Sequence, residues 1–225
     1  MKKIWMISDT HGCHEQLPKA IADIVIHSGD CSNRREPVFN QFEVKSFIDW
    51  YASLDIQYKV FVAGNHDTSI WKGLISPSYI KDKGIIYLEH SGVEIEGINI
   101  WGSPYTPTFG EGWAWNVRRD RLTQTWLSIP VELDILVTHG PPKGILDISV
   151  DREDNIEFCG DLALYKAVIN REIKYHQFGH IHNNGDIQNA GTKTLSNQIT
   201  TFVNASCVTD RKMGELSSSG EIIEI

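Results

Sequence analysis

The chain has 225 residues, of which 41% are hydrophobic and 22% are charged, with a formal net charge of −8. This composition excludes a disordered or fibrous protein and is typical of a globular chain with one generous core, or at most two small ones. The acidic balance disfavours binding to long nucleic acids, which depends on clustered lysine and arginine. No stretch approaches the roughly 18 to 20 apolar residues of a membrane-spanning helix, and the start lacks the pattern of a secretory signal. We therefore expect a cytoplasmic protein without membrane association.

Short β-type runs recur along the chain, and most of them end in glycine or a polar residue. The predicted strands are 3–8, 23–28, 59–62, 99–101, 134–138, 176–179 and 201–204, and the chain closes with an apolar run at 221–225. Between them lie helical patterns, one with an apolar face from Val44 to Leu54 and another that follows Asp161, a typical N-cap. This alternation predicts one α/β domain over residues 1–225, with a late loop at 210–220. The β-rich second half favours a mixed sheet or a two-sheet sandwich flanked by helices.

The four cysteines are scattered along the chain and show no C-x-x-C spacing. They are Cys13, Cys31, Cys159 and Cys207. This distribution indicates reduced, mostly structural thiols and argues against both a disulfide framework and a thiolate zinc site.

Histidine and aspartate residues gather where the predicted strands end. The motifs are Asp9-x-His11, Gly29-Asp30, Gly64-Asn65-His66-Asp67, His139-Gly140 and Gly179-His180-x-His182. In an open α/β sheet, ligands bind at the carboxyl ends of the strands, so these side chains are expected to meet. The nitrogen and oxygen ligands suit first-row metal ions such as Mn, Fe, Zn, Ni or Co, and there are too many for one ion. A carboxylate such as that of Asp30 can bridge two ions about 3.5 to 4 Å apart.

The five motifs, in this order, resemble those of the calcineurin-like metallophosphoesterases over roughly residues 1–207. Segments 101–107, 113–116 and 139–142 resemble the small phosphodiesterase-like branch that includes the metallophosphoesterase-domain-containing proteins of animals. Some animal members carry glycine in place of the first histidine of Gly-His-x-His, whereas His180 is present here. The resemblance implies a four-layer α/β-β/α sandwich and full occupancy by two divalent or trivalent metal ions.

The resemblance also implies the role of each motif residue. The ligands of one metal would be Asp9, His11, Asp30 and His182. The ligands of the other would be Asp30, Asn65, His139 and His180. His66 would stabilise the pentavalent phosphorus and protonate the leaving oxygen, with Asp67 orienting its ring. In that mechanism a metal-bridging hydroxide attacks phosphorus in line.

The segment from Trp101 to Asn116 is unusually rich in aromatic residues for a connection. These rings could stack a nucleobase beside the metals, or they could pack the loop onto the sandwich. The candidate substrate-binding residues are Asn65, His66, Tyr105 and Trp113.

Other residues match no motif and receive structural interpretations. His27 and His176 lie inside predicted strands, where packing is the expected role. The arginines at 118, 119 and 121 follow at a predicted helix start and are interpreted as a solvated face.

The activity preferred on this basis is hydrolysis of cyclic nucleotides or related small phosphodiesters, with the small phosphoester as the expected partner. A phosphomonoesterase is the nearest alternative, because it needs the same cations, and manganese is among the candidate ions. A non-catalytic scaffold with this fold is the third hypothesis, and the intact ligand set argues against it. The sequence makes no prediction of the oligomeric state.

Overall fold

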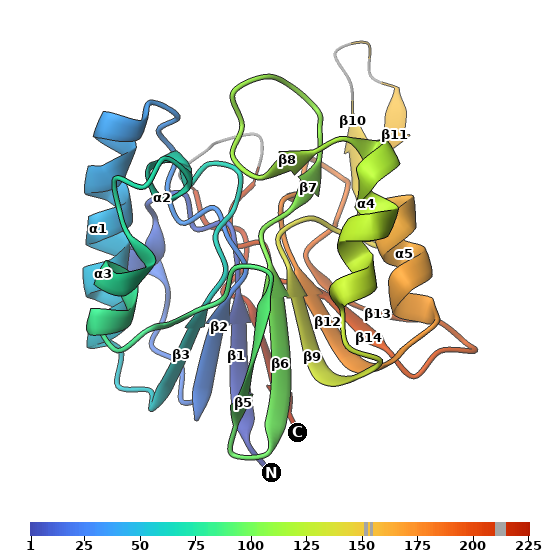
Figure 1. Cartoon of the computed structure of the whole chain (residues 1–225), viewed down its shortest axis with the longest axis horizontal. Coiled ribbons are helices and arrows are strands. Elements are labelled where there is room, and N and C mark those ends of the chain that lie inside the picture. Colours follow the sequence, from blue (N-terminus) through green and yellow to red (C-terminus); the bar gives the residue numbers. More distant parts are fainter. Residues whose placement is uncertain (151–152, 154, 210–214) are drawn as a thin grey trace.

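The computed structural model describes residues 1–150, 153, 155–209 and 215–225. Two mixed β-sheets pack face to face, with helices on both outer faces (Figure 1). The first sheet has the order β15-β1-β2-β3-β4 and the second β13-β14-β12-β9-β6-β5. This arrangement confirms the expected four-layer α/β-β/α sandwich. No helix in the described part of the chain has both the length and the apolar character that crossing a bilayer requires.

The strands of the first sheet are β1 (Lys3–Ile7), β2 (Ile24–His27), β3 (Tyr58–Phe61), β4 (Ile86–Tyr87) and β15 (Glu221–Glu224). Those of the second are β5 (Ser91–Ile95), β6 (Ile98–Ser103), β9 (Glu132–Thr138), β12 (Glu172–Phe178), β13 (Gly191–Thr194) and β14 (Thr201–Asn204). Two further pairs are β7 (Thr106–Pro107) with β8 (Asn116–Val117), and β10 (Ile148–Val150) with β11 (Ile156–Phe158). The helices are α1 (Pro37–Ser53), α2 (Thr68–Trp71), α3 (Pro77–Asp82), α4 (Arg119–Thr125) and α5 (Leu162–Ile169), with 3₁₀ turns at His14–Gln16 and Trp126–Ser128.

Three apolar cores hold the layers together. Between the sheets, isoleucine and valine side chains such as Ile26 and Val60 meet Ile135 and Val137 of the facing sheet. The outer face of the first sheet packs on α1 through Phe47 and its neighbours, and that of the second packs on α4 and α5. Strands β1 and β2 are therefore buried on both faces over almost their whole length, and β3 is buried at Val60 and Phe61, which is why these strands read as short apolar runs in the sequence.

The parallel strands explain why the motifs converge. Strand β2 pairs in parallel with β1 and β3, and β9 pairs in parallel with β6 and β12. A parallel bridge between Ser8 and Ser206 joins the two sheets at the ends of β1 and β14. The carboxyl ends of both sets of strands therefore share one edge of the sandwich, at the top in Figure 1.

The predicted strands all exist, but the prediction missed strands β4, β5, β7, β8, β10, β11 and β13 and the short helices α2 and α3. Some predicted elements also begin earlier than expected. Helix α1 starts at Pro37, well before the apolar face at Val44, because the Glu36 side chain accepts a hydrogen bond from the Phe39 amide at 3.0 Å. Strand β12 starts at Glu172, before the predicted start at His176, and its first residues alternate between exposed Glu172 and Lys174 and the buried Ile173. Residues 210–214 of the predicted late loop lie outside the described residues.

The structural interpretations of the cysteines and of the two strand histidines are confirmed. All four cysteines are free thiols. His27 and His176 are fully buried, and each ring contacts a threonine of a site turn. His27 Nε2 lies 3.1 Å from Thr10 Oγ1, and His176 Nε2 lies 2.8 Å from Thr138 Oγ1. The two rings therefore brace the turns that carry Asp9, His11 and His139.

Candidate metal centre

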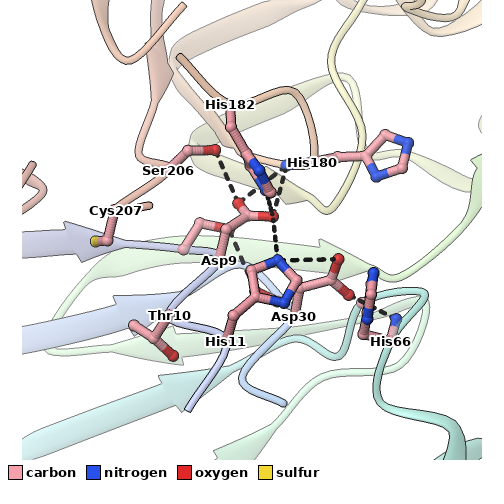
Figure 2. A network of polar contacts seen from close by, with 12 residues as sticks. Asp9, Thr10, His11, Asp30, His66, His180, His182, Ser206 and Cys207 are labelled. Carbon is pink, nitrogen blue, oxygen red and sulfur yellow. Dashed lines mark hydrogen bonds and ion pairs between the residues drawn. The ribbon is translucent and has the colours of Figure 1, made fainter. Parts of the chain in front are cut away.

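Five turns bring the predicted ligands to one place, each following a strand of the sandwich. The turns after β1, β2 and β3 carry Asp9 with His11, Asp30, and Asn65. The turns after β9 and β12 of the other sheet carry His139, and His180 with His182. Figure 2 shows Asp9, Asp30, His11 and His182 pointing toward one another, with the His180 ring to one side.

The first group joins Asp9, His11 and His182, whose candidate ligand atoms all lie within 4.8 Å of one another. His182 Nε2 lies 3.1 Å from Asp9 Oδ1, and His11 Nε2 lies 4.0 Å from the same oxygen. The other Asp9 oxygen accepts a hydrogen bond from the Ser206 hydroxyl at 2.9 Å. Three side chains from opposite sheets thus surround one small polar space.

The second group joins Asp30, His139 and His180 within the same 4.8 Å limit. His139 Nε2 lies 3.3 Å from Asp30 Oδ2. The same Asp30 oxygen lies 3.9 Å from His11 Nε2, so Asp30 lies between the two groups. This is the position that a carboxylate shared by two metal ions must occupy.

Asn65 belongs with the second group and gives an independent test of whether a cation fits. Its Oδ1 lies 2.8 Å from His139 Nε2, while His139 Nδ1 donates to the Ser28 carbonyl at 2.9 Å. With Nδ1 protonated, a neutral His139 presents a lone pair at Nε2, opposite the lone pair of an amide oxygen. Such a pair of acceptors needs a positive charge between them, either a proton or a metal ion.

A second observation supports the fit. His11 Nδ1 donates to the Ser32 carbonyl at 3.0 Å, and His11 Nε2 is buried without a hydrogen-bond partner in the described part of the chain. A backbone carbonyl that fixes one ring nitrogen leaves the other as a metal ligand, as is typical of metal-bound histidine. The donor set is carboxylate, amide and imidazole, without thiolate, which suits first-row metal ions.

The protonation states point the same way. Burial lowers the pKa of His11 to about 4 and that of His180 to about 3, so both rings are neutral, as metal ligands must be. Burial would raise the pKa of Asp30, yet the nearby His139 and His66 hold it well below its usual range. Burial opposes charge on His139 too, but the Asp30 carboxylate raises its pKa to about 9. A metal ion that binds here would displace that proton.

The backbone of the site is held in uncommon conformations. Asp9, His11, Asp30 and His180 have φ angles of 50°, 42°, 56° and 69°. Non-glycine residues rarely adopt this left-handed region, which costs about 1–3 kcal/mol each and is concentrated at functional sites. The fold therefore holds these four residues in uncommon backbone conformations at the two adjacent ligand groups.

Close packing at Gly64 gives a testable consequence. A Cβ added there would overlap the Asp30 carboxylate and lie 2.7 Å from the His139 ring. We expect Gly64→Ala to lower the free energy of unfolding by about 1–3 kcal/mol and to weaken metal binding, because Asp30 must move. Denaturant unfolding and metal content measured on the same variant check this. Gly92→Ala, on strand β5, is the control, and equal metal content in the two variants would contradict the expectation.

The expected contact, in which Asp67 orients the His66 ring, is replaced by other hydrogen bonds. His66 Nδ1 donates to the Asn33 carbonyl at 3.0 Å, so that carbonyl, and not Asp67, orients the ring. The Asp67 carboxylate is fully buried and accepts hydrogen bonds from the Asp30 and Gly64 amides at 3.0 and 2.8 Å. Asp67 therefore ties together the turns that carry Asp30 and Asn65.

The His66 ring itself lies at the metal centre. It makes an edge contact with His11, with ring centroids 4.7 Å apart, and with His11 and Asp30 it forms a third group of close ligand atoms. Its backbone amide donates to Asp30 Oδ1 at 2.7 Å. Since Nδ1 is engaged by a carbonyl, Nε2 is the atom left to meet a substrate.

Part of the aromatic loop covers this centre. The Trp113 ring lies 4.7 Å from the His66 ring, and the Phe109 ring lies 5.1 Å from the His180 ring, measured between centroids. Trp113 and Phe109 contact each other at 5.5 Å. Together they form an aromatic wall, the name used below for these two residues.

Tyr105 takes a different place from Trp113. It packs at 5.0 Å on His90, and its ring contacts in the described residues do not include the histidines of the metal centre. Phe109 was not among the predicted substrate-binding residues, although the aromatic density of its loop is the signal that points to it. The solvated face at the start of α4 is confirmed, since Arg118, Arg119 and Arg121 are exposed.

Arg35 is a further residue of the site that motif reasoning missed. Its guanidinium lies over the Trp113 ring, 3.8 Å from the centroid, and its Nη2 donates to the Glu111 carbonyl at 2.7 Å. These contacts attach the aromatic loop to the segment before α1 and fix the indole beside His66. No sequence motif marks Arg35, because motifs group residues that are close in the sequence and its partner Trp113 lies 78 positions later.

Comparisons with known proteins agree with this geometry. The family model described as calcineurin-like phosphoesterase matches residues 2–184. Metallophosphoesterase domain-containing protein 1 of Homo sapiens is 35% identical over 227 aligned positions, covering 90% of this chain and 65% of the relative. A UPF0046 protein of Caenorhabditis elegans is 33% identical, covering 90% of this chain and 69% of the relative. The chain thus spans about two thirds of the length of these relatives.

A comparison with a solved structure supports the fold assignment. The phosphopantetheinyl hydrolase of Mycobacterium tuberculosis superposes with a TM-score of 0.57 at 16% identity. The superposition covers 93% of this chain and 90% of that one. At this identity the comparison supports the four-layer architecture alone.

Proposed function

Because the chain belongs to the calcineurin-like phosphoesterase family, we propose that it is a phosphodiesterase with two metal ions that hydrolyses cyclic nucleotides or related small phosphodiesters. The coarser reaction class follows from the family and from the clusters of histidine and aspartate. The single observation that carries the diester proposal is the aromatic wall. Trp113 and Phe109 lie against His66 and His180 and offer ring faces to an organic group attached to phosphate.

The metal ions would be held by the two ligand sets that share Asp30. When bound, two metal ions activate the attacking water and neutralise charge on the phosphoryl oxygens. Which first-row ions bind in the cell stays a prediction, with manganese as the ion to try first, because several ions tolerate this donor set.

Residues of the chain would supply the proton, contact the phosphoryl group and position the ligands. His66 donates from Nδ1 to the Asn33 carbonyl, so it would act with both ring nitrogens protonated, passing the Nε2 proton to the departing alkoxide and becoming a neutral imidazole. Asn65 would contact the phosphoryl group as well as a metal ion. Asp67 would act as a positioning residue by holding the Asp30 and Gly64 amides, which sets where the substrate meets the ligands.

The first experiment compares diester and monoester hydrolysis on one preparation. Chelator-stripped protein is titrated with Mn²⁺, and turnover of bis-p-nitrophenyl phosphate is measured beside p-nitrophenyl phosphate. Metal-dependent preference for the diester supports the proposal and leads to a panel of cyclic nucleotides. Preference for the monoester indicates a phosphatase, and inactivity on both compounds with two ions bound indicates a scaffold.

The aromatic wall gives a specific prediction about nucleotides. Trp113→Ala is expected to raise KM for a nucleotide diester by about five- to a hundredfold, because base stacking contributes about 1–3 kcal/mol per base. KM for bis-p-nitrophenyl phosphate should rise less, since its smaller rings stack on less of the indole. Tyr105→Ala is the matched control, because Tyr105 packs on His90. Equal increases for both substrates in Trp113→Ala would indicate that the indole only packs the loop.

A further inference from the structure

Asn40 is a fully buried polar residue on the packed face of helix α1, where its neighbours include Val44 and Phe47. Asparagine is a poor helix former, and burial of its amide is unfavourable unless hydrogen bonds replace those made with water. The reason for an asparagine at this position must therefore lie in its partners.

The Asn40 side chain joins two segments of the chain, residues 32–34 and 66–69. Its Nδ2 lies 2.8 Å from the His66 carbonyl oxygen and 2.6 Å from the Arg34 carbonyl oxygen. It also lies 2.8 Å from Ser32 Oγ, so its two N–H groups are shared among three acceptors. Its Oδ1 accepts a hydrogen bond from the Ser69 amide at 2.9 Å. One side chain of α1 thus ties the turn that follows β2 to the turn that carries His66.

Glu43, three positions after Asn40 on α1, also holds segment 32–34. Its Oε2 accepts hydrogen bonds from the Asn33 and Arg34 amides at 2.7 and 2.9 Å. A trans peptide group is planar, with its N–H and C=O pointing in opposite directions. The peptide between Asn33 and Arg34 therefore donates to Glu43 on one side and accepts from His66 Nδ1 on the other, at 3.0 Å. Because Asn40 holds the next carbonyl of the segment, the two helix residues together determine where the Asn33 carbonyl lies.

His66 is thereby held at three atoms. Its amide donates to Asp30 Oδ1 at 2.7 Å, its carbonyl accepts from Asn40, and its ring Nδ1 donates to the Asn33 carbonyl. Two of these three contacts depend on Asn40, either directly or through segment 32–34. A histidine side chain turns about two bonds, and the contact at Nδ1 restricts both, so the same contacts direct Nε2.

We propose that Asn40 is a positioning residue for the reaction, which holds His66 so that its Nε2 meets the leaving oxygen. The inference rests on the proposed function, in which His66 protonates that oxygen. The hydrogen bonds of the Asn40 side chain go to Ser32, Arg34, His66 and Ser69, none of which is a predicted metal ligand. Replacement of Asn40 should therefore leave both metal ions bound.

Asn40→Asp removes the donated hydrogen bonds with little change in volume. One carboxylate oxygen can still accept from the Ser69 amide, whereas the other faces the His66 and Arg34 carbonyls without a proton to donate. His66 should then shift, and a misplacement of about 1 Å can cost about a hundredfold in rate. For a diester with a poor leaving group, we expect kcat to fall by about ten- to a hundredfold while KM stays within about twofold.

The substrates are two diesters that retain the same methyl group, methyl phenyl phosphate and methyl p-nitrophenyl phosphate. Phenolate is the more basic leaving group, so its departure depends more on a proton donor. Turnover of methyl phenyl phosphate should carry almost the whole loss in Asn40→Asp, and turnover of methyl p-nitrophenyl phosphate should fall by less than about threefold. Metal content is measured on the same preparation and should stay at two ions per chain.

A double-mutant cycle separates positioning from a general loss of structure. In a His66→Ala background, no ring is left to displace, so Asn40→Asp should change turnover of methyl phenyl phosphate by less than about twofold. A structural effect independent of His66 would lower turnover by the same factor in both backgrounds.

Glu43→Ala is a second variant with the opposite change of charge. It removes the acceptor of the Asn33 and Arg34 amides, and the Glu43 side chain is 27% exposed, so the protein should fold even where a substitution of buried Asn40 prevents folding. Asn40→Asp adds a negative charge near His66, whereas Glu43→Ala removes one. A selective loss of phenyl diester turnover in both variants therefore reports the position of His66 and not the charge around it.

Two residues of α1 provide the controls. Tyr51→Phe is matched to Asn40→Asp, because Tyr51 is fully buried and its hydroxyl lies within hydrogen-bond distance of two strand carbonyls. Asp49→Ala is matched to Glu43→Ala, because Asp49 is an exposed carboxylate that pairs with Lys83. Both controls should keep the wild-type ratio of turnover between the two diesters.

The outcomes separate this inference from the proposed function. Equal losses on the two diesters in Asn40→Asp, or a further loss in the His66→Ala background, overturn the positioning role and leave the phosphodiesterase proposal standing. Where Asn40→Asp does not fold, an unchanged ratio in Glu43→Ala overturns it in the same way. An unchanged ratio in His66→Ala alone shows that His66 is not the acid and leaves Asn40 nothing to position. Absence of turnover of both diesters by the wild-type chain with two metal ions bound overturns the proposed function and this inference with it.

Discussion

Replacing Asp30 by alanine is expected to remove both metal ions and to lower phosphoester turnover by about a thousandfold or more, which corresponds to several kcal/mol of lost metal-ion catalysis. Asp30 lies between the two ligand groups, with its Oδ2 3.3 Å from His139 Nε2 and 3.9 Å from His11 Nε2. Loss of this carboxylate leaves each group with one anionic ligand fewer. Loss at one residue should therefore empty both sites.

The measurement is metal per chain after gel filtration in Mn²⁺, beside turnover of bis-p-nitrophenyl phosphate. Asp161→Ala is a useful control, because Asp161 is equally buried but caps α5, where it accepts hydrogen bonds from the Ala163 and Leu164 amides. That variant should lose stability and keep its metal. A folded Asp30→Ala protein that retains two metal ions per chain would refute the shared-ligand assignment.

Asp30→Asn refines this result. The side chain can still accept a hydrogen bond from the His66 amide, as Asp30 Oδ1 does at 2.7 Å. Its negative charge is gone, however, and that charge is what holds the pKa of His139 at about 9 despite burial. If charge and not shape holds the ions, Asp30→Asn should lose metal nearly as fully as Asp30→Ala.

The sequence was informative about the site because each predicted ligand follows an apolar strand. Strands β1, β2, β3, β9 and β12 are buried at their carboxyl ends, and the glycine and polar residues that follow each of them mark the edge of the sheet. Parallel pairing then brings those ends together. The four-layer architecture came from the family resemblance, since alternation alone left a single mixed sheet open.

Contacts between loops could not be predicted in the same way. Arg35 meets Trp113, and Phe109 meets His180, through loops whose course no periodicity determines. The Asp67 carboxylate accepts hydrogen bonds from backbone amides and from the Ser32 hydroxyl and the Cys31 thiol, and no motif or spacing in the sequence marks these donors as its partners. Strands β4, β7, β8, β10 and β11 also went unpredicted, because two or three residues are too few to show a period of two. Strands β5 and β13 are longer, but they carry glycine and exposed polar residues, which weaken a strand pattern.

His66→Ala is expected to keep both metal ions and to lower turnover by about 10²- to 10⁴-fold, the range for loss of a general acid. The His66 ring is close enough to His11 and Asp30 to be mistaken for a ligand, with its centroid 4.7 Å from that of His11. Metal content therefore decides between the two roles. A variant that loses metal together with activity would place His66 among the ligands.

The choice of leaving group separates two roles of His66, proton donation and stabilisation of charge on the phosphoryl oxygens. A p-nitrophenolate departs readily without a proton, whereas an alkoxide departs slowly unless a proton is supplied. If His66 donates that proton from Nε2, His66→Ala should impair an alkyl diester far more than a p-nitrophenyl diester, and the wild-type difference between the two substrates should widen. His90→Ala is the matched control, because His90 is a half-buried histidine that packs on Trp101 and Tyr105. An equal loss on both substrates would instead assign His66 to stabilising charge on the phosphoryl oxygens, since that charge develops whichever group departs.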